Sequence, residues 1–264
     1  MKFDELDQKL RVYETAHDFC VPPHIYMVAR LDGRGFTKLT KETHAFERPF
    51  DARFRDMMVE TVQHLMGCGF KVIYGYTESD EISLLFGLRE DAFSRKLRKY
   101  HSVLAGEASA KFSTLLGDVG VFDCRVAQLP RPQLVVDYFR WRHEDAHRNA
   151  LNAHCYWLLR GQGKSVKEAT HHIAGKSTGF KNELLFENGI NFNDLPSWQK
   201  RGVGLYWEDS EKEGWNPKTE ERVITTRKHI KVDDELPIGD AYDDFVRGIL
   251  KGEEDWDIDR VPQL

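Results

Sequence analysis

Three carboxylates in the first third of the chain have the residue types that phosphoryl transfer requires. Asp32 follows an apolar run and precedes a glycine, while Asp80 and Glu81 lie between two further apolar runs. Carboxylates that are brought together repel one another, so their convergence is explained best by bound divalent cations. Mg²⁺ takes oxygen ligands and leaves positions for water and phosphate, and two ions can hold both the attacking and the leaving oxygen. These residues therefore predict a two-metal site for phosphoryl or nucleotidyl transfer.

A turn with two glycines follows Asp32 directly and is suited to the phosphates of a nucleotide. Backbone N–H groups of Gly33-Arg34-Gly35-Phe36 can surround an anion, as in other glycine-rich turns. A non-catalytic interpretation stays open, because Asp before Gly is common in turns and an acidic hairpin tip is ordinary at an exposed surface.

The segments around these carboxylates predict a sheet that brings them together. Their order is strand, helix, hairpin, helix, strand, or βαββαβ, which is typical of the split βαβ (ferredoxin-like) fold. Its first and third strands are central neighbours, and if they run antiparallel, Asp32 and Asp80 meet at one end of the sheet. The strands are expected at 24–31, 70–76, 82–86 and 119–129, and the helices at 50–66 and 91–116.

The second half of the chain predicts a smaller α+β extension. We therefore expect a mixed α/β (α+β) protein with a catalytic core at 1–132 and a C-terminal α+β extension at 133–264, packed as one unit. Further helices are expected at 2–19, 137–159 and 165–174, and further strands at 200–208 and 222–232.

A basic run on the second predicted helix of the core offers further contacts. Its cations could bind a triphosphate or the terminal phosphate of an RNA, and Lys41 and Arg48 could add to the same field. Such a run is also ordinary on the solvated face of a helix. It comprises Arg95, Lys96, Arg98 and Lys99, with Lys111 further along.

Composition excludes several classes of protein. The 264 residues are 41% hydrophobic and 12% aromatic, which supplies a sizeable core and argues against disorder. No apolar run approaches the roughly 18 residues of a membrane span, and the start lacks the apolar stretch of a signal peptide. Four widely spaced cysteines fit neither a zinc knuckle nor a redox pair, so we expect a reducing, cytoplasmic setting.

The net charge of −5 is concentrated at the C-terminus. Residues 233–264 hold 11 acidic and three basic side chains, which leaves the other 232 residues with a net charge of +3. We expect this acidic tail to be a solvated surface. The overall charge neither requires nor excludes a nucleic-acid partner.

Three short motifs match functional patterns only weakly. The run His143–His147 fits the H-E-x-x-H pattern of zinc proteases, but Glu168 is the only candidate for a third ligand and the flanking arginines are too polar for a buried zinc helix. Gly163-Lys164-Ser165 and Gly175-Lys176-Ser177 resemble the end of a P-loop but lack its first glycine. We assign none of them a role.

Several motifs in one order resemble those of the tRNA-histidine guanylyltransferase and Thg1-like family of reverse-direction (3′–5′) polymerases. The resemblance covers residues 24 to 208, and spaced motifs in one order are far more specific than any single one. The motifs are Arg30–Phe36, Ser79-Asp80-Glu81, Phe122–Val126, Asp137-Tyr138 with Trp141-Arg142, Lys181–Phe186, and Asn191–Pro196 leading to Lys200-Arg201-Gly202.

The resemblance implies a polymerase-palm-like core with an Mg²⁺ site. By resemblance, Asp32 and Asp80 hold two Mg²⁺ ions. The Gly33 carbonyl is a further ligand, Glu81 supports the site, and the backbone of residues 34–36 holds the nucleoside triphosphate. ATP or GTP then activates the 5′-monophosphate of a tRNA, and the 3′-hydroxyl of an incoming nucleotide attacks that activated end.

The resemblance also implies contacts beyond the metal site. Asp51 matches a position that meets the guanine base. The family forms tetramers, so a homo-oligomer is implied as well. Positions implicated in the activation step or in phosphate contacts are matched by Ser79, Arg48, Arg125 and Lys181.

One departure from the family pattern changes the expected substrate. Eukaryotic members carry His-Ile-Asn-Asn-Leu-Tyr-Asn, a stretch tied to recognition of the histidine tRNA, whereas residues 147–153 keep only His147, Asn149 and Leu151. By resemblance, the retained His147 is a contact to the tRNA. This loss is similar to the Thg1-like branch, whose members favour template-dependent repair of 5′-truncated tRNAs. Arg48 also stands where better known members have Lys, which keeps the charge but changes the geometry.

Two other functions stay open on the residues alone. A palm-type nucleotide cyclase would share the aspartates but need no RNA, and a non-catalytic RNA-binding module could share the βαββαβ topology. Such modules place stacked aromatics on the sheet face, whereas this chain places carboxylates at strand ends. We therefore expect an Mg²⁺-dependent nucleotidyltransferase that acts on the 5′ end of tRNA.

Overall fold

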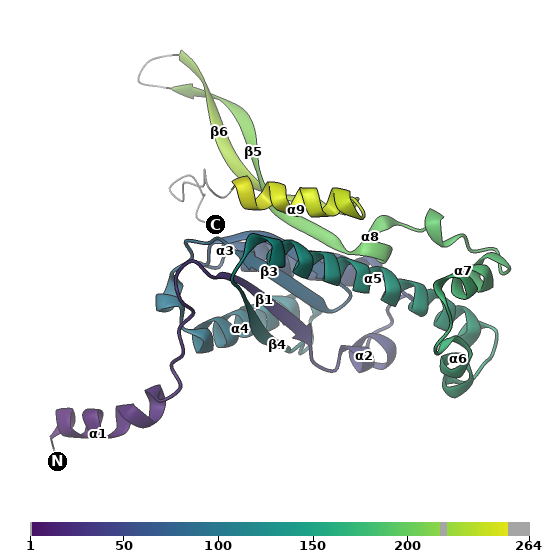
Figure 1. The fold of residues 1–264 in the computed structure, drawn as a ribbon, viewed down its shortest axis with the longest axis horizontal. Helices are drawn as coiled ribbons and strands as arrows, with labels where there is room; N and C mark the ends of the chain where they lie inside the picture. The colour runs from purple at the N-terminus through teal and green to yellow at the C-terminus, as the bar shows by residue number, and fades with distance from the viewer. Residues whose placement is uncertain (1, 217–220, 253–264) are drawn as a thin grey trace.

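A six-stranded sheet with helices on both faces forms the body of the molecule (Figure 1). The computed structural model describes residues 2–216 and 221–252. The strands are β1 (Tyr26–Gly33), β2 (Val72–Glu78), β3 (Glu81–Phe86), β4 (Phe122–Leu129), β5 (Val203–Asn216) and β6 (Glu221–Asp233). The helices are α1 (Phe3–Thr15), α2 (Phe36–Lys38), α3 (Ala52–Gly67), α4 (Leu97–Leu116), α5 (Pro132–Gly161), α6 (Val166–Ile173), α7 (Thr178–Phe186), α8 (Ser197–Arg201) and α9 (Asp240–Gly252).

All strand pairs are antiparallel, in the order β4-β1-β3-β2-β5-β6. The first four strands, with α3 and α4 between them, form the predicted βαββαβ unit with β1 and β3 at its centre, so the mixed α/β fold class is confirmed. The two late strands form no sheet of their own, because β5 pairs with β2 along Tyr74–Thr77 and continues the same sheet. The division into two units at residue 132 stays a prediction.

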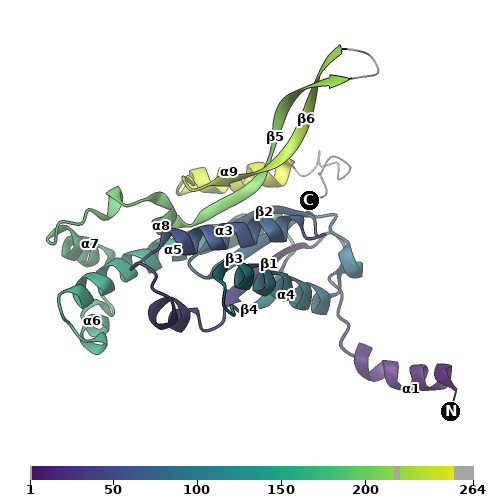
Figure 2. The ribbon, with the colours of Figure 1, turned by 180° about the vertical axis from the view of Figure 1, so that it is seen from behind.

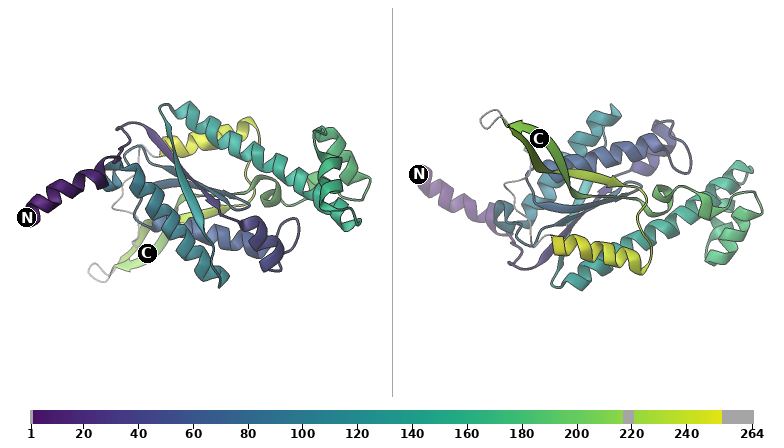
Figure 3. Two further views of the ribbon diagram at one scale, coloured as in Figure 1. Left: turned by 90° about the horizontal axis from the view of Figure 1, so that it is seen from below. Right: turned by 90° about the horizontal axis from the view of Figure 1, so that it is seen from above.

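Alternation along the strands divides the apolar side chains between two cores. Leu31 and Ile82 pack with α3 and α4, while Val28 and Leu85 pack with α5 and α9. Figures 2 and 3 show these helix pairs on opposite faces of the sheet. Each such buried side chain contributes about 1.5–3 kcal/mol. Because Asp32 has the same parity as Val28, its side chain projects toward the α5 face.

The acidic tail contains a helix with one buried face. In α9, Tyr242, Val246 and Leu250 are buried, and the Tyr242 hydroxyl lies 3.1 Å from that of Tyr74. Their four-residue spacing puts all three on one side of the helix. The expectation that the tail is simply a solvated surface is therefore wrong for α9, while residues 253–264 lie outside the described part of the chain.

Two segments extend away from the body. Helix α1 buries none of its residues and projects from one end, and the β5–β6 hairpin continues beyond the sheet (Figures 1 and 2). Among the helices in the described ranges, none combines the length and the apolar composition needed to cross a membrane.

Candidate active site

The central strand pair brings the predicted carboxylates to one end of the sheet. Asp32 on β1 lies opposite Glu81 on β3, and the Gly33 N–H donates to the Asp80 carbonyl at 3.0 Å. Residues directly opposite in an antiparallel pair project to the same face, so Asp32 and Glu81 both point to the side that α5 covers. The predicted antiparallel pairing is confirmed, and it places Asp32 beside the turn that carries Asp80.

A strained two-residue turn presents Asp80. Glu78 pairs with Glu81 across the β2–β3 hairpin, which leaves Ser79 and Asp80 as the turn. Ser79 has φ 51°, a left-handed conformation that costs a non-glycine residue roughly 1 kcal/mol. Its hydroxyl donates to Asp80 Oδ1 at 3.1 Å. Strain of this kind persists only where neighbouring structure enforces it, and it clusters at functional sites.

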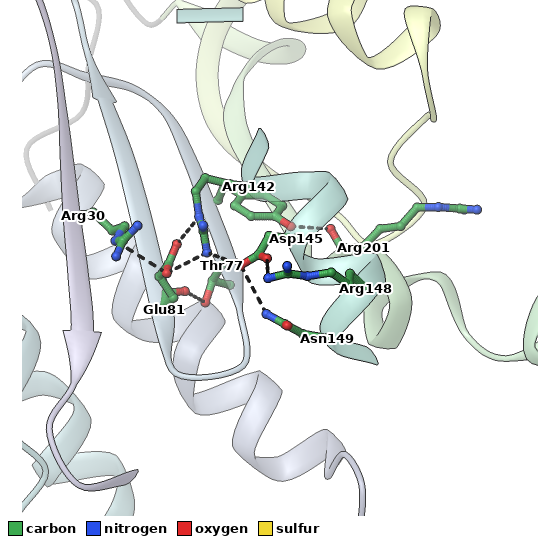
Figure 4. A network of polar contacts seen from close by, with 9 residues as sticks. Arg30, Thr77, Glu81, Arg142, Asp145, Arg148, Asn149 and Arg201 are labelled. Carbon is green, nitrogen blue, oxygen red and sulfur yellow. Dashed lines mark hydrogen bonds and ion pairs between the residues drawn. The ribbon is translucent and has the colours of Figure 1, made fainter. Parts of the chain in front are cut away.

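Arg142 of α5 holds both carboxylate oxygens of Glu81. Its Nε and Nη2 donate at 2.6 and 2.8 Å, and its side chain is only 6% exposed. Arg30 Nε approaches the same carboxylate at 3.6 Å, and Asp145 accepts from Arg142 at 3.2 Å (Figure 4). This network ties α5 to the hairpin that carries Asp80. The arrangement agrees with a supporting role for Glu81, whereas its direct ligation of a metal stays a prediction.

Negative charge in this turn is only partly compensated. Burial and the nearby Asp32 carboxylate raise the pKa of Asp80. Burial, followed by the charge of Glu81, raises the pKa of Glu78 to about 8. Sequence reasoning missed Glu78, although its place directly before Ser79 and Asp80 was a usable signal. A divalent cation would relieve this repulsion more completely than a shared proton.

The donors at this end of the sheet fit Mg²⁺. Asp32 and Asp80 border a cavity, and Mg²⁺ commonly combines one or two carboxylates with waters and substrate phosphates. Among residues 2–216 and 221–252, no group of three His, Cys, Asp or Glu side chains is placed to hold a metal, so Asp32, Asp80 and Glu81 do not form a three-carboxylate site. The Gly33 carbonyl stays a predicted ligand.

The glycine turn after Asp32 is fixed by an aromatic cluster. Phe36 is buried, and its ring lies 5.0 Å from those of Phe112 and Phe122. A Cβ at Gly33 would come within 2.5 Å of the Phe36 ring, so only glycine fits there. The Arg34 N–H already donates to the Val121 carbonyl at 2.8 Å. The expected phosphate contacts of this turn are therefore reduced to the N–H groups of residues 35 and 36.

A cavity of about 750 Å³ begins at the carboxylates and follows one face of α5. The α5 residues that line it recur every three or four positions from Arg142 to Tyr156, a span of about 21 Å. Its volume is that of a small-molecule or cofactor site. The lining includes Arg30, Asp32, Glu78, Ser79, Asp80, Glu81, Trp141 and Arg142, together with Lys41, Phe50, Asp51, Tyr156, Trp157, Ile173 and Trp198.

Two predicted nucleotide contacts, Arg48 and Asp51, lie in the segment directly before α3. Asp51 is 6% exposed and caps α3, accepting from the backbone N–H groups of Arg53 and Glu47, both at 2.7 Å. The Arg53 side chain holds the pKa of Asp51 at about 2. Arg48 lies over Trp157, with its guanidinium carbon 4.3 Å from the ring centroid. The contact of Asp51 with a guanine base stays a prediction.

The basic run before α4 lies at the other end of the sheet. Arg95 is 7% exposed and donates to the carbonyls of Val21, Ile25 and Glu90 at 3.1, 2.5 and 2.7 Å. Ile25 directly precedes β1, whereas Asp32 lies roughly 20 Å further along that strand. The expected phosphate contact of Arg95 is wrong, because the left-handed turn at 93–95 directs its guanidinium inward, onto backbone carbonyls.

The rest of the basic run is outside the cavity lining as well. Lys96 and Arg98 form ion pairs with Asp18, the first at 3.1 Å, and Lys99 lies over Phe93 at 5.5 Å. Contacts of these three cations with RNA phosphates stay predictions, for a surface at the opposite end of the sheet from Asp32.

Three other predicted contacts also do not line the cavity. Arg125 lies opposite Arg30 in the β1–β4 register and is exposed. His147 packs edge-on against Phe192, with centroids 5.3 Å apart, and Lys181 is half-buried on α7. Their roles toward RNA or phosphate stay predictions.

Comparison with known proteins gives the family. Residues 7–130 match the family model described as tRNAHis guanylyltransferase, and residues 133–244 match the model of the Thg1 C-terminal domain. The tRNA(His) guanylyltransferase of Debaryomyces hansenii is 31% identical over 229 residues, which cover 80% of this chain and 86% of that protein. The probable tRNA(His) guanylyltransferase of Mus musculus is 32% identical over 205 residues, covering 74% of this chain and 68% of that protein.

Solved structures agree with this match. A bacterial tRNA(His) guanylyltransferase-like protein in complex with GTP has a TM-score of 0.71 and 27% identity, covering 94% of this chain and 99% of that one. Its complex with ATP has a TM-score of 0.72, again at 27% identity, covering 93% and 99%. The chain therefore belongs to the tRNA(His) guanylyltransferase family, a family of nucleotidyltransferases.

Proposed function

We propose that this protein is an Mg²⁺-dependent 3′–5′ nucleotidyltransferase that adds nucleotides to the 5′ end of tRNA. The observation that carries the proposal is the position of Asp32 and Asp80 at adjacent ends of β1 and β3, at the mouth of a cavity that continues along α5. The family of named tRNA(His) guanylyltransferases and the GTP and ATP complexes of a similar bacterial protein support the same substrates here.

In this proposal the side chains position the reacting groups. Asp32 and Asp80 hold two Mg²⁺ ions, which when bound polarise phosphate oxygens and neutralise developing charge. Arg142 holds Glu81 and so keeps the hairpin, and with it Asp80, at a fixed place relative to Asp32. The N–H groups of residues 35 and 36 orient the triphosphate. The 3′-hydroxyl of the incoming nucleotide attacks the 5′-phosphate that ATP or GTP has activated, and the activating group leaves.

We infer that the preferred task is template-dependent repair of 5′-truncated tRNAs. Residues 147–153 keep little of the stretch that the eukaryotic pattern ties to the histidine tRNA. His147, which is kept, packs against Phe192 and does not line the cavity. The resemblance also implies a homotetramer, which light scattering of the purified protein would test.

The direct experiment is extension of 5′-monophosphate tRNAs that lack one or more leading nucleotides, with all four nucleoside triphosphates and Mg²⁺. We expect the wild type to restore the missing nucleotides in the order that the opposite strand dictates. Asp32→Ala and Asp80→Ala should abolish addition without loss of stability, because each removes a source of repulsion. Retained addition by either variant would refute the assignment of the metal site.

Asp244→Ala is a matched control for the change in charge. Asp244 is 77% exposed on α9 and does not line the cavity, so addition should stay within a few fold of wild type. Two further outcomes would replace the proposal. A cyclic product from labelled GTP without RNA would show a cyclase, and RNA binding that ignores Mg²⁺, without turnover, would show a binding module.

A further inference from the structure

Helix α1 carries a stripe of apolar side chains that is left uncovered. The helix projects from the body and buries none of its residues (Figures 1 and 2). The chain after it is fixed to the body, because the Val21 N–H donates to the Arg95 carbonyl at 3.0 Å. Within the described residues the stripe is therefore open to solvent. We call it the seam, and it consists of Phe3, Leu6, Leu10 and Tyr13, which are 80%, 41%, 55% and 80% exposed.

The spacing of the seam is that of a coiled coil. Its members follow one another at intervals of three, four and three residues, which is the alternation of positions a and d in a heptad. A free helix of 13 residues is marginal in water, so α1 needs to pack its apolar face to be stable. Both observations indicate a second helix as the partner of the seam.

Charges beside the seam indicate which helix this is and in which direction it runs. Lys9 at position g is basic, whereas Asp7 and Glu14 at position e are acidic, so the two flanks have opposite charges. In a parallel pair, position g faces position e of the other helix, which puts Lys9 against Glu14 of a second copy on both sides. An antiparallel pair would set like flanks together. Because Asp7 already pairs with Arg11 of its own helix at 2.6 Å, the contact between Lys9 and Glu14 determines the direction.

An anionic lipid surface suits this helix less well than a second copy does. Helices that lie on such surfaces have a polar face rich in Lys and Arg. Residues 2–15 instead hold four acidic and three basic side chains, so the helix has no net attraction to anionic lipid.

We propose that α1 is a dimerisation arm, which pairs in parallel with α1 of a second copy of this chain along the seam. A two-fold axis then runs along the seam, and each layer joins identical residues. Two heptads are short for a free coiled coil. The pair gains its strength where other contacts already hold two copies together, at an effective concentration on the order of mM. The inference rests on the proposed homo-oligomer for that proximity and does not depend on the proposed chemistry.

Disulfide trapping in the full-length protein tests the pairing. A Cys20→Ser background removes the exposed native thiol, and Leu6→Cys then places one thiol in the seam. In a parallel pair the two introduced thiols face each other, so mild oxidation should convert most of the protein to covalent dimer. Gln8→Cys is the matched control. It lies at position f, on the far side of the helix, and should give roughly a tenth of that yield or less.

Charge variants of the Leu6→Cys protein test the flanks. Lys9→Glu makes both flanks acidic and should reduce the rate of trapping roughly 3- to 10-fold at low salt. The double substitution Lys9→Glu with Glu14→Lys exchanges the two charges and should restore the rate, because opposite charges face each other again. A merely local effect on the helix would not be rescued in this way, so a rate that stays low in the double variant would contradict the pairing of the flanks.

Two further outcomes would overturn the arm or its direction. The arm is wrong if Leu6→Cys forms no more covalent dimer than Gln8→Cys does. The direction is wrong if a mixture of Leu6→Cys and Leu10→Cys proteins links more completely than either variant alone, because an antiparallel pair sets these two positions opposite each other. Light scattering separates this test from the proposed tetramer. A tetramer without the disulfide refutes only the arm, and a covalent dimer from a protein that forms no tetramer refutes only the tetramer.

Discussion

The two ends of the central strands differ in how far their charged side chains are paired. At the catalytic end, where β1 stops and β3 starts, burial and neighbouring carboxylates raise the pKa values of Glu78 and Asp80: Glu81 acts on Glu78, and Asp32 acts on Asp80. At the other end, which we call the anchor end, Arg95 donates to three backbone carbonyls. The Arg98 and Lys96 cations there hold the pKa of Asp18 at about 2.

This difference shows at which end the protein's own groups pair the charged side chains. The anchor end satisfies its buried cation with protein groups, and its acidic side chain is paired twice. The catalytic end pairs Glu81 with Arg142 but keeps Asp80 near Asp32 and holds Ser79 in a strained conformation, so part of its charge is left for a ligand to balance. Substitutions confined to one end should therefore separate effects on stability from effects on activity.

The largest effect on stability and activity is expected at the Arg142–Glu81 pair, where the catalytic end does compensate a buried charge. Arg142→Ala leaves the Glu81 carboxylate buried without its main partner, which typically costs 3–5 kcal/mol. The hairpin that carries Asp80 would then lose its link to α5, so nucleotide addition should fall along with the free energy of unfolding. Urea denaturation and the extension assay measure the two effects.

Arg148→Ala is the control for this substitution. Arg148 also pairs with Asp145 but is 71% exposed, so its loss should change stability by less than about 1 kcal/mol. If Arg142→Ala were as mild as this control, the link between α5 and the hairpin would not position Asp80.

A smaller effect, confined to stability, is expected at the anchor end. Arg95→Ala leaves buried carbonyls of Val21, Ile25 and Glu90 without a donor, which should cost about 2–4 kcal/mol. Activity per folded molecule should stay unchanged below the melting transition, because the site is at the other end of β1. Lys99→Ala, which removes a cation held over Phe93, should cost less than about 1 kcal/mol. A loss of activity in Arg95→Ala without a matching loss of stability would instead support the prediction that Arg95 contacts a phosphate.

The anchor end also shows where sequence reasoning fails. Periodic spacing and turn residues predict the βαββαβ order and the meeting of Asp32 with Asp80, because strand pairing converts sequence order directly into position. The direction of a long side chain, in contrast, does not follow from sequence order. Arg95 stands among solvated cations in the sequence, yet three consecutive left-handed residues turn it into the core. The acidic run at 240–252 was likewise predicted to be a solvated surface from its net charge, although Tyr242, Val246 and Leu250 form an apolar stripe within it.

The two ends should respond to pH with opposite signs. Glu78 has a folded-state pKa of about 8, above its ordinary 4.5, so its contribution is fully present below pH 4.5 and is lost as the pH rises through 8. The loss should be on the order of 2 kcal/mol, after allowance for solvent around a partly exposed group. Asp18 behaves inversely, because its pKa of about 2 lies below 3.8, so stability is lost as the pH falls from 3.8 toward 2.

Single substitutions separate these two dependences. In urea titrations without divalent cations, Glu78→Gln should flatten the loss of stability between pH 4.5 and 8 and leave the loss below pH 3.8 unchanged, and Asp18→Asn should do the reverse. A loss of stability between pH 4.5 and 8 that survives in Glu78→Gln would show that another group at the catalytic end carries the proton.

The smallest effect tests whether the catalytic end stores strain. Ser79→Gly should relieve the left-handed backbone and raise the free energy of unfolding by up to about 1 kcal/mol, while Ser79→Ala keeps the strain. Both variants lose the hydroxyl that donates to Asp80, so the difference between their stabilities isolates the backbone. Both should also add nucleotides more slowly, because Asp80 is less firmly oriented. A glycine variant that is more stable and equally fast would mean that the strained turn serves neither the metal site nor the fold, and the contrast between the two ends would then rest on charge alone.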